Sequence, residues 1–228
     1  MQTSTEFDEA PPRTVYLTYD DGPSRNTAAL LDVLKEEGVK ATFFVVGKED
    51  DASLALYRRI ADEGHTLGIH TYSHLYREIY KSVDSYLEDF NRIENLLFDV
   101  TGIHPKIFRF PGGSVNAIAP SRATLNRIIE EITGRGYIYY DWNVVSGDDT
   151  STVYPAETLA ANVMKGGKDK DTVVVLFHDA PLCKTTPEAT RLVIRQFKEK
   201  GYQFDRLTES VKPIQFAETR KRQARTGK

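Results

Sequence analysis

The sequence predicts an α/β protein, a distorted (β/α)-barrel of about seven parallel strands, and three observations predict it. Short runs of apolar and β-branched residues recur along the chain, each followed by a helix-like segment. Alternation of this kind indicates right-handed βα units and a parallel sheet. The units lack a dinucleotide glycine fingerprint, which favours barrel-like closure over an open sheet. Polar residues gather where the expected strands end, which is typical of a barrel with its active site at the C-terminal strand ends.

The first three strands are marked most clearly. Residues 14–19 (TVYLTY) form the first, and the helix after it starts near Asn26, a suitable cap, and stops at Gly38. The second and third strands are residues 41–46 (ATFFVV) and 65–70 (HTLGIH). The long amphipathic helix that follows the third strand has its apolar residues three to four positions apart, at Val83, Leu87, Phe90, Leu97 and Val100.

The second half of the chain continues the alternation. Further strands are expected at residues 106–110, 137–142, 172–178 and 202–207. The run at 172–178 (TVVVLFH) is almost wholly apolar, which predicts a strand buried on both faces. The helices between these strands are expected around Leu125, Ile129 and Ile132, near residues 157–164, and over residues 187–200.

Composition limits the organisation and the partners of the chain. With 228 residues, 40% of them hydrophobic and 28% charged, we expect one domain over residues 14–212. Residues 1–13 resemble a linker and residues 213–228 a basic tail. The net charge is −3, so no overall positive charge would attract nucleic acid. No apolar run reaches the ~18 residues of a membrane span. Cys183 is the sole cysteine, so no internal disulfide can form, and we expect a monomer.

Residues with side chains suited to catalysis lie at or just beyond the ends of the expected strands. They are Asp20, Asp21, His70, His74, Arg109, Asp141 and His178. In a βα-barrel the C-terminal strand ends converge on one face, so residues about 160 positions apart are expected to meet in one cleft.

Two histidines and two carboxylates in this set predict a metal site. The stretch HTYSH places His70 and His74 four residues apart, without the glutamate of the HExxH motif, so the pair alone also fits two hydrogen-bonded polar residues in a loop. With Asp21 as a third ligand the set would hold one divalent metal ion and leave positions open for water. Asp20 would then be free to act as a base on that water.

Five stretches of the chain resemble the motifs of the polysaccharide deacetylase family (carbohydrate esterase family 4, the NodB homology domain), in the family's order. They are TYDDGP, HTYSH, RFPGGS, YYDWN and VLFHD, which lie between residues 18 and 179. The similarity covers nearly all of the chain outside its two ends, and bacterial peptidoglycan N-acetylglucosamine deacetylases are the members it resembles.

The resemblance implies a role for each residue at the strand ends. Asp20 matches the general base and Arg109 the residue that pairs with it. His178 matches the general acid, and Asp141 the carboxylate that orients it. The implied metal ligands are Asp21, His70 and His74.

The resemblance also implies residues that contact substrate. Trp142 and Leu176 match positions that line the pocket for the acetyl methyl group. Phe110, Pro111 and Gly112 follow Arg109 in the third motif, and Gly112 stands where the family often has tyrosine; its backbone N–H would hold the oxyanion. We expect the acidic stretch SGDDT, at residues 146–150, to be a solvated loop.

The implied function is metal-dependent hydrolysis of N-acetyl groups on a glycan of the peptidoglycan or chitin type. Zinc is the expected metal, and cobalt, nickel or iron would fit the same ligands. By analogy with the family we expect an extracellular or cell-wall location. Four alternatives stay open: an O-acetyl-xylan esterase, a small-molecule amidohydrolase, a non-catalytic carbohydrate-binding module, and a non-haem iron oxygenase, whose two-histidine, one-carboxylate ligand set is the same.

Overall fold

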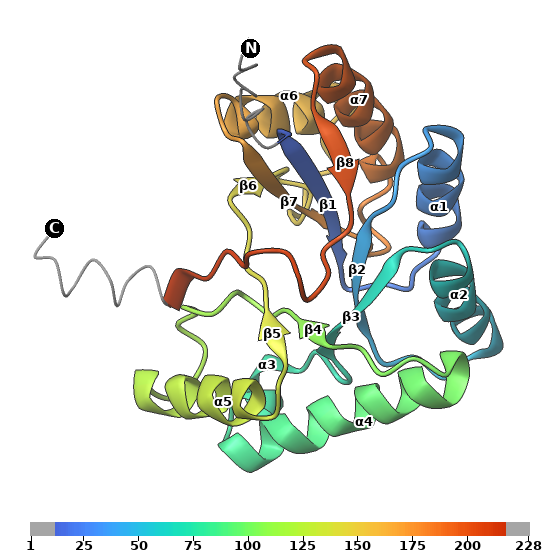
Figure 1. The fold of residues 1–228 in the computed structure, drawn as a ribbon. Coiled ribbons are helices and arrows are strands. Elements are labelled where there is room, and N and C mark those ends of the chain that lie inside the picture. Colours follow the sequence, from blue (N-terminus) through green and yellow to red (C-terminus); the bar gives the residue numbers. More distant parts are fainter. Residues whose placement is uncertain (1–11, 218–228) are drawn as a thin grey trace, which may run out of the picture.

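A parallel β-sheet curves inside a row of helices in the computed structural model, which describes residues 12–217 (Figure 1). Its strands are β1 (Thr14–Asp20), β2 (Thr42–Val46), β3 (Thr66–Thr71), β4 (Ile107–Phe108), β5 (Ile138–Tyr139), β6 (Val144–Val145), β7 (Thr172–His178) and β8 (Gln203–Asp205). Its helices are α1 (Thr27–Glu36), α2 (Asp51–Asp62), α3 (Tyr76–Ile79), α4 (Val83–Thr101), α5 (Arg122–Gly134), α6 (Ala156–Gly167) and α7 (Thr186–Glu199).

The order of the strands is that of an incomplete barrel. Seven strands of the described range follow the order β5-β4-β3-β2-β1-β7-β6, and every pairing is parallel. Strand β1 pairs with β7 along its whole length, from Thr14 opposite Thr172 to Asp20 opposite His178. Its other edge is shared by β8 at the start and β2 at the end. The prediction of a distorted (β/α)-barrel with about seven parallel strands is confirmed.

The two faces of the sheet are different because side chains alternate along each strand. The outer face carries residues such as Val15, Leu17 and Tyr19 into the large core beneath the helices. The inner face carries a smaller apolar cluster that includes Tyr16, Phe44, Ile107, Tyr140 and Val174. Towards the strand ends the inner face becomes polar, with Thr18, Asp20, His70, Arg109 and His178. The apolar cluster and the polar cluster therefore lie side by side on the inner face of the sheet.

Of the expected strand at residues 137–142 only the two residues of β5 form a strand, and β6, which follows shortly after, lies at the opposite end of the sheet. Strand β5 pairs with β4, whereas β6 pairs with β7, so the chain crosses the open side of the barrel between them. Asn143 lies at this crossing: its backbone N–H donates to the carbonyl of Val174 (3.1 Å), and its side-chain oxygen accepts from the N–H of Val174 (2.8 Å). The aromatic residues of this stretch are continuous in the sequence, so the sequence pattern does not show that the chain changes from pairing with β4 to pairing with β7.

The segment after β8 covers the open side of the barrel, where no described pairing joins β5 to β6 (Figure 1). The N–H of Asp141 donates to the carbonyl of Ile214 (2.8 Å), and the Tyr140 hydroxyl lies 2.6 Å from the carbonyl of Val211. Ala217 is fully buried. Residues 213–217, which the sequence places in the basic tail, are therefore packed against the domain, while the remaining tail and residues 1–11 of the linker lie outside the described residues.

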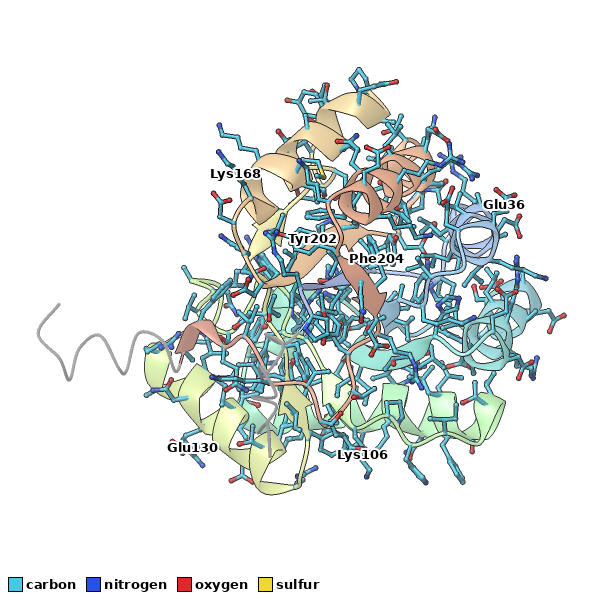
Figure 2. All side chains as sticks on the ribbon, turned by 45° about the horizontal axis from the view of Figure 1, so that its top comes forward. Glu36, Lys106, Glu130, Lys168, Tyr202 and Phe204 are labelled. Carbon is cyan, nitrogen blue, oxygen red and sulfur yellow. The ribbon has the colours of Figure 1, made fainter. Side chains whose placement is uncertain are left out.

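The opposite end of the barrel is formed by the starts of the strands. Lys106, Lys168 and Tyr202, labelled in Figure 2, come shortly before β4, β7 and β8 and mark this end. Within residues 12–217, none of the helices combines the length and apolar character that a membrane-spanning helix requires.

Candidate active site

Four strands of the sheet bring polar side chains to one end of the barrel. Asp20 and His178 are the last residues of β1 and β7 and face each other in the parallel ladder. His70 lies near the end of β3, and Arg109 directly follows β4. Because all these strands are parallel, their C-terminal ends meet at the same edge, so the convergence expected from the sequence is present.

Asp21, His70 and His74 point their ligand atoms at a common centre. The three atoms lie within 4.8 Å of one another. Asp21 Oδ1 is 3.1 Å from His74 Nε2 and 3.5 Å from His70 Nε2. Asp21 and His74 both have positive φ, 74° and 54°, which turns their side chains back towards the strand ends.

The chemistry of these atoms fits a divalent cation. His70 Nδ1 donates to the carbonyl of Arg109 (2.8 Å), so the lone pair of the neutral ring is on Nε2 and faces Asp21. Burial is the largest influence on His70 and lowers its pKa, which favours the neutral, ligating form. Asp21 Oδ1 is buried and has no hydrogen-bond partner. A buried carboxylate oxygen without a geometrically satisfied hydrogen bond, beside the Nε2 atoms of two histidines, is what a metal ion would satisfy.

Asp20 is held next to this cluster by Arg109. The fully buried guanidinium donates to Asp20 Oδ1 (2.9 Å) and to the Thr18 hydroxyl (2.6 Å). It also donates to the carbonyls of Tyr140 (2.8 Å) and Asp141 (3.1 Å), so all three of its nitrogens donate hydrogen bonds. The second oxygen, Asp20 Oδ2, lies 4.0 Å from His70 Nε2.

His178 is paired with Asp148. Its Nδ1 donates to Asp148 Oδ1 (2.9 Å), and its backbone N–H donates to Asp148 Oδ2 (2.9 Å). Asp148 also accepts from the hydroxyls of Ser146 and Thr186 (both 2.8 Å). Burial lowers the pKa of His178, but the hydrogen bond and charge of Asp148 outweigh it and raise that pKa to about 9. The imidazolium form is therefore favoured at neutral pH, with Nε2–H available as a proton donor.

The expectation that Asp141 orients His178 requires correction. Asp141 is buried, and its Oδ1 accepts from the backbone N–H of Ser114 (2.9 Å). Its Oδ2 accepts from the Ser114 hydroxyl (2.6 Å) and the backbone N–H of Phe216 (2.7 Å). Both carboxylate oxygens are thus used to hold Ser114, in the loop after β4, and Phe216, in the C-terminal segment.

Asp148 was missed because SGDDT looked like a solvated loop in the sequence. It lies three residues after β6, a strand of two residues within what appeared to be a loop. Placing Val144 and Val145 in a strand would have made Asp148 another carboxylate near a strand end. Its neighbour Asp149 is exposed, as the sequence suggested.

The five residues expected to contact substrate lie in different surroundings. Phe110 is buried on the outer face, with ring contacts to Tyr86 and Tyr139, so its side chain packs in the core instead of facing the site; this expectation is wrong. Pro111 is buried, and its carbonyl accepts from the Tyr80 hydroxyl (2.8 Å).

Trp142, Leu176 and Gly112 are less completely buried than Phe110. Trp142 is half-buried and packs on the inner apolar cluster, and Leu176 is on the inner face of β7. Gly112 is exposed and has a φ of 74°. Proline cannot adopt that φ, and an alanine Cβ would be 3.1 Å from Asn116 Cβ, so neither substitution would test the Gly112 N–H alone.

A pocket of about 520 Å³ opens beside the metal ligands and the histidine pair. Asp21, Asp148 and His178 form its polar side. Ala180, Pro181, Leu182 and Cys183 contribute to its apolar side. A ligand in this pocket would have an apolar wall against it and the proton donor within reach.

The chain is similar to known proteins over most of its length. The model of the family described as polysaccharide deacetylase matches residues 8–133, which is more than half of the chain. The chain belongs to the polysaccharide deacetylase family. A putative polysaccharide deacetylase of Bacillus subtilis is 34% identical over 205 residues, a match that covers 89% of this chain and 70% of that protein.

Solved structures of family members have the same fold. The catalytic domain of a peptidoglycan N-acetylglucosamine deacetylase from Eubacterium rectale is 35% identical with a TM-score of 0.85, covering 90% of this chain and 93% of that one. A family 4 acetyl xylan esterase from Clostridium thermocellum, solved in complex with a cobalt ion, is 32% identical with a TM-score of 0.68 and covers 86% and 89%.

Proposed function

We propose that this protein is a metal-dependent hydrolase that removes N-acetyl groups from a glycan and releases acetate. One observation carries the proposal: a three-atom ligand cluster, an Asp20–Arg109 pair and a His178–Asp148 pair converge at one edge of the sheet. A ligand set, a base and an acid are the components that metal-assisted amide hydrolysis needs.

In this proposal Asp21, His70 and His74 hold the cation. A divalent cation bound there supplies a Lewis acid that activates water and polarises the acetyl carbonyl. Asp20, held in place by Arg109, takes the proton of the attacking water. The backbone N–H of Gly112 donates to the developing oxyanion, and Trp142 and Leu176 line the space for the acetyl methyl group.

His178 completes the reaction by giving a proton to the departing amine nitrogen. An amine is a poor leaving group unless it is protonated, whereas the alkoxide that leaves from an O-acetyl ester has less need of an acid. Asp148 raises the pKa of His178 to about 9 against the effect of burial, so the acid form is available at neutral pH. This favours amide over ester hydrolysis.

The alternative functions lack a comparable observation. An acetyl-xylan esterase remains the second candidate because such an enzyme is 32% identical to this chain. A binding module would not require the Asp20–Arg109 and His178–Asp148 pairs. An iron oxygenase would consume oxygen, and an oxygen electrode would detect it.

The relatives suggest where the substrate is found. Because a similar structure is that of a peptidoglycan N-acetylglucosamine deacetylase, we propose peptidoglycan or a chitin-like N-acetylhexosamine chain as substrate. Action outside the cell or at its wall, by a monomer, is part of this proposal. Zinc suits two imidazoles and a carboxylate, and the ligand types also accept cobalt, nickel or iron.

Acetate release tests the function directly. The protein is stripped with a chelator and assayed on peptidoglycan, chitooligosaccharide and acetylxylan, with and without added Zn²⁺ or Co²⁺. We expect metal-dependent acetate release from the two N-acetylated substrates, with acetylxylan slower. Equal rates with and without the metal, or release from acetylxylan alone, would contradict the proposal.

Replacing Asp148 by asparagine is expected to move the alkaline limb of the pH profile of kcat to lower pH. His178 must be protonated to act as an acid, and activity is lost as the pH rises through its raised pKa of about 9. Asparagine can still accept the hydrogen bond from Nδ1 but brings no negative charge. The pKa of His178 should therefore fall towards the ordinary value of about 6.5.

The measurement is kcat against pH for the wild type, Asp148→Asn and the control Asp149→Asn. Asp149 is the exposed neighbouring carboxylate, and its loss should shift the limb far less. If the limb of Asp148→Asn stays at its wild-type position, it belongs to another group and His178 is not the acid.

A further inference from the structure

The segment from Thr71 to His74, which starts directly after the first histidine and ends at the second, is held by helix α4. Asp89 of α4 accepts two backbone hydrogen bonds from it, from the N–H of Tyr72 to Oδ1 (2.5 Å) and from the N–H of Ser73 to Oδ2 (2.9 Å). The N–H of His74 donates to the Thr71 hydroxyl (3.2 Å). The N–H groups of Tyr72, Ser73 and His74 thus each have a partner that fixes their direction.

The side chain of Tyr72 fixes the same segment from the other side. The backbone carbonyl of Tyr72 accepts from the N–H of Gly47 (2.9 Å), and the Tyr72 ring lies so close that a Cβ at Gly47 would be 2.3 Å from it. The Arg92 guanidinium lies 3.5 Å from the ring centroid, and Glu49 accepts a hydrogen bond from the hydroxyl. Arg92 is on α4, one turn after Asp89.

This support has a consequence for the second histidine. His74 has a φ of 54°, a conformation that a non-glycine residue adopts at a cost and keeps only when its surroundings impose it. Rotation of the Tyr72 and Ser73 peptides would carry His74 Nε2 away from its position 3.1 Å from Asp21 Oδ1. A carboxylate that accepts two backbone N–H groups is a strong restraint against that rotation.

We propose that Asp89 is a positioning residue for metal binding, which pre-arranges His74 beside Asp21 and His70 without touching the ion. The proposal rests on the proposed function only in assuming that the cluster of Asp21, His70 and His74 binds metal. Asp89 itself is outside that cluster, and both its oxygens are used by the backbone. Losing a residue that supports a metal ligand typically costs about 10–100-fold in metal affinity.

The test is titration of the metal-free protein with Co²⁺, followed by absorbance and calorimetry. Asp89→Ala is expected to bind Co²⁺ about 10–100-fold more weakly than the wild type, and Asp89→Asn to be intermediate, because its amide oxygen can accept only one of the two N–H groups well. The control is Glu88→Ala, which removes the neighbouring exposed carboxylate of α4 and should leave the dissociation constant unchanged.

A second readout separates positioning from general damage. Acetate release by Asp89→Ala should recover towards the wild-type kcat when Co²⁺ is saturating, because the ligands themselves remain. If Asp89→Ala is poorly folded by circular dichroism, Asp89→Asn gives the comparison. A wild-type dissociation constant in a folded Asp89 variant would overturn this inference alone, whereas a wild-type protein that binds no Co²⁺ would overturn the proposed function with it.

Discussion

His70→Ala is expected to lose both the bound metal and the hydrolytic activity. His70 is the most buried of the three ligand residues, and its Nδ1 bond to Arg109 fixes the direction of Nε2. Alanine leaves Asp21 and His74 as the only ligands, so the loss of affinity should exceed the about 10–100-fold that follows removal of a merely supporting residue. Elemental analysis of the purified variant and its acetate release measure the two effects.

The matched control for this experiment is His104→Ala. His104 is a surface histidine with a side chain 53% exposed, close to Glu94 and remote in the fold from the strand ends. This variant should keep metal and activity. Stoichiometric metal in His70→Ala would show that the cation is held elsewhere.

Asp20→Asn should show the opposite combination, with metal retained and turnover lost. Asp20 is not one of the three clustered ligand residues, and Arg109 binds its Oδ1. An asparagine cannot take a proton from water, so kcat should fall by roughly 10²–10⁴, the usual contribution of a general base. The measurement is kcat at saturating substrate together with metal content.

Asp32→Asn serves as the control for Asp20→Asn, since Asp32 is a surface carboxylate paired with Arg59. It should change neither quantity. If Asp20→Asn emptied the site while Asp21→Asn retained the metal, the two adjacent aspartates would have to exchange their proposed roles.

The sequence was most informative where local patterns correspond to long strands. The apolar runs that form β1, β2, β3 and β7 are long enough to be recognised as strands from the sequence. Because these strands pair in parallel, their last residues come together. For this reason Asp20, His70 and His178 could be brought to one edge without any structure. Asp21 and His74 lie just beyond two of these strands and were placed at the same edge for the same reason.

The parts that the sequence did not reveal depend on contacts between distant segments. Asp148 follows a strand of only two residues, which no local pattern marks. Asp141 lies near a strand end, as expected, but Ser114 and Phe216 take its carboxylate. Asp89 is one of many polar residues on an amphipathic helix, and only the packing of α4 against the loop shows that it differs from Glu88.

X-ray diffraction from crystals of the zinc-loaded protein, recorded on both sides of the zinc absorption edge, tests the central claim most directly. The account predicts one anomalous peak among Asp21 Oδ1, His70 Nε2 and His74 Nε2, about 2.0–2.2 Å from each. The peak should be absent from crystals of His70→Ala. An active, zinc-replete protein with its peak at any other position would contradict the account.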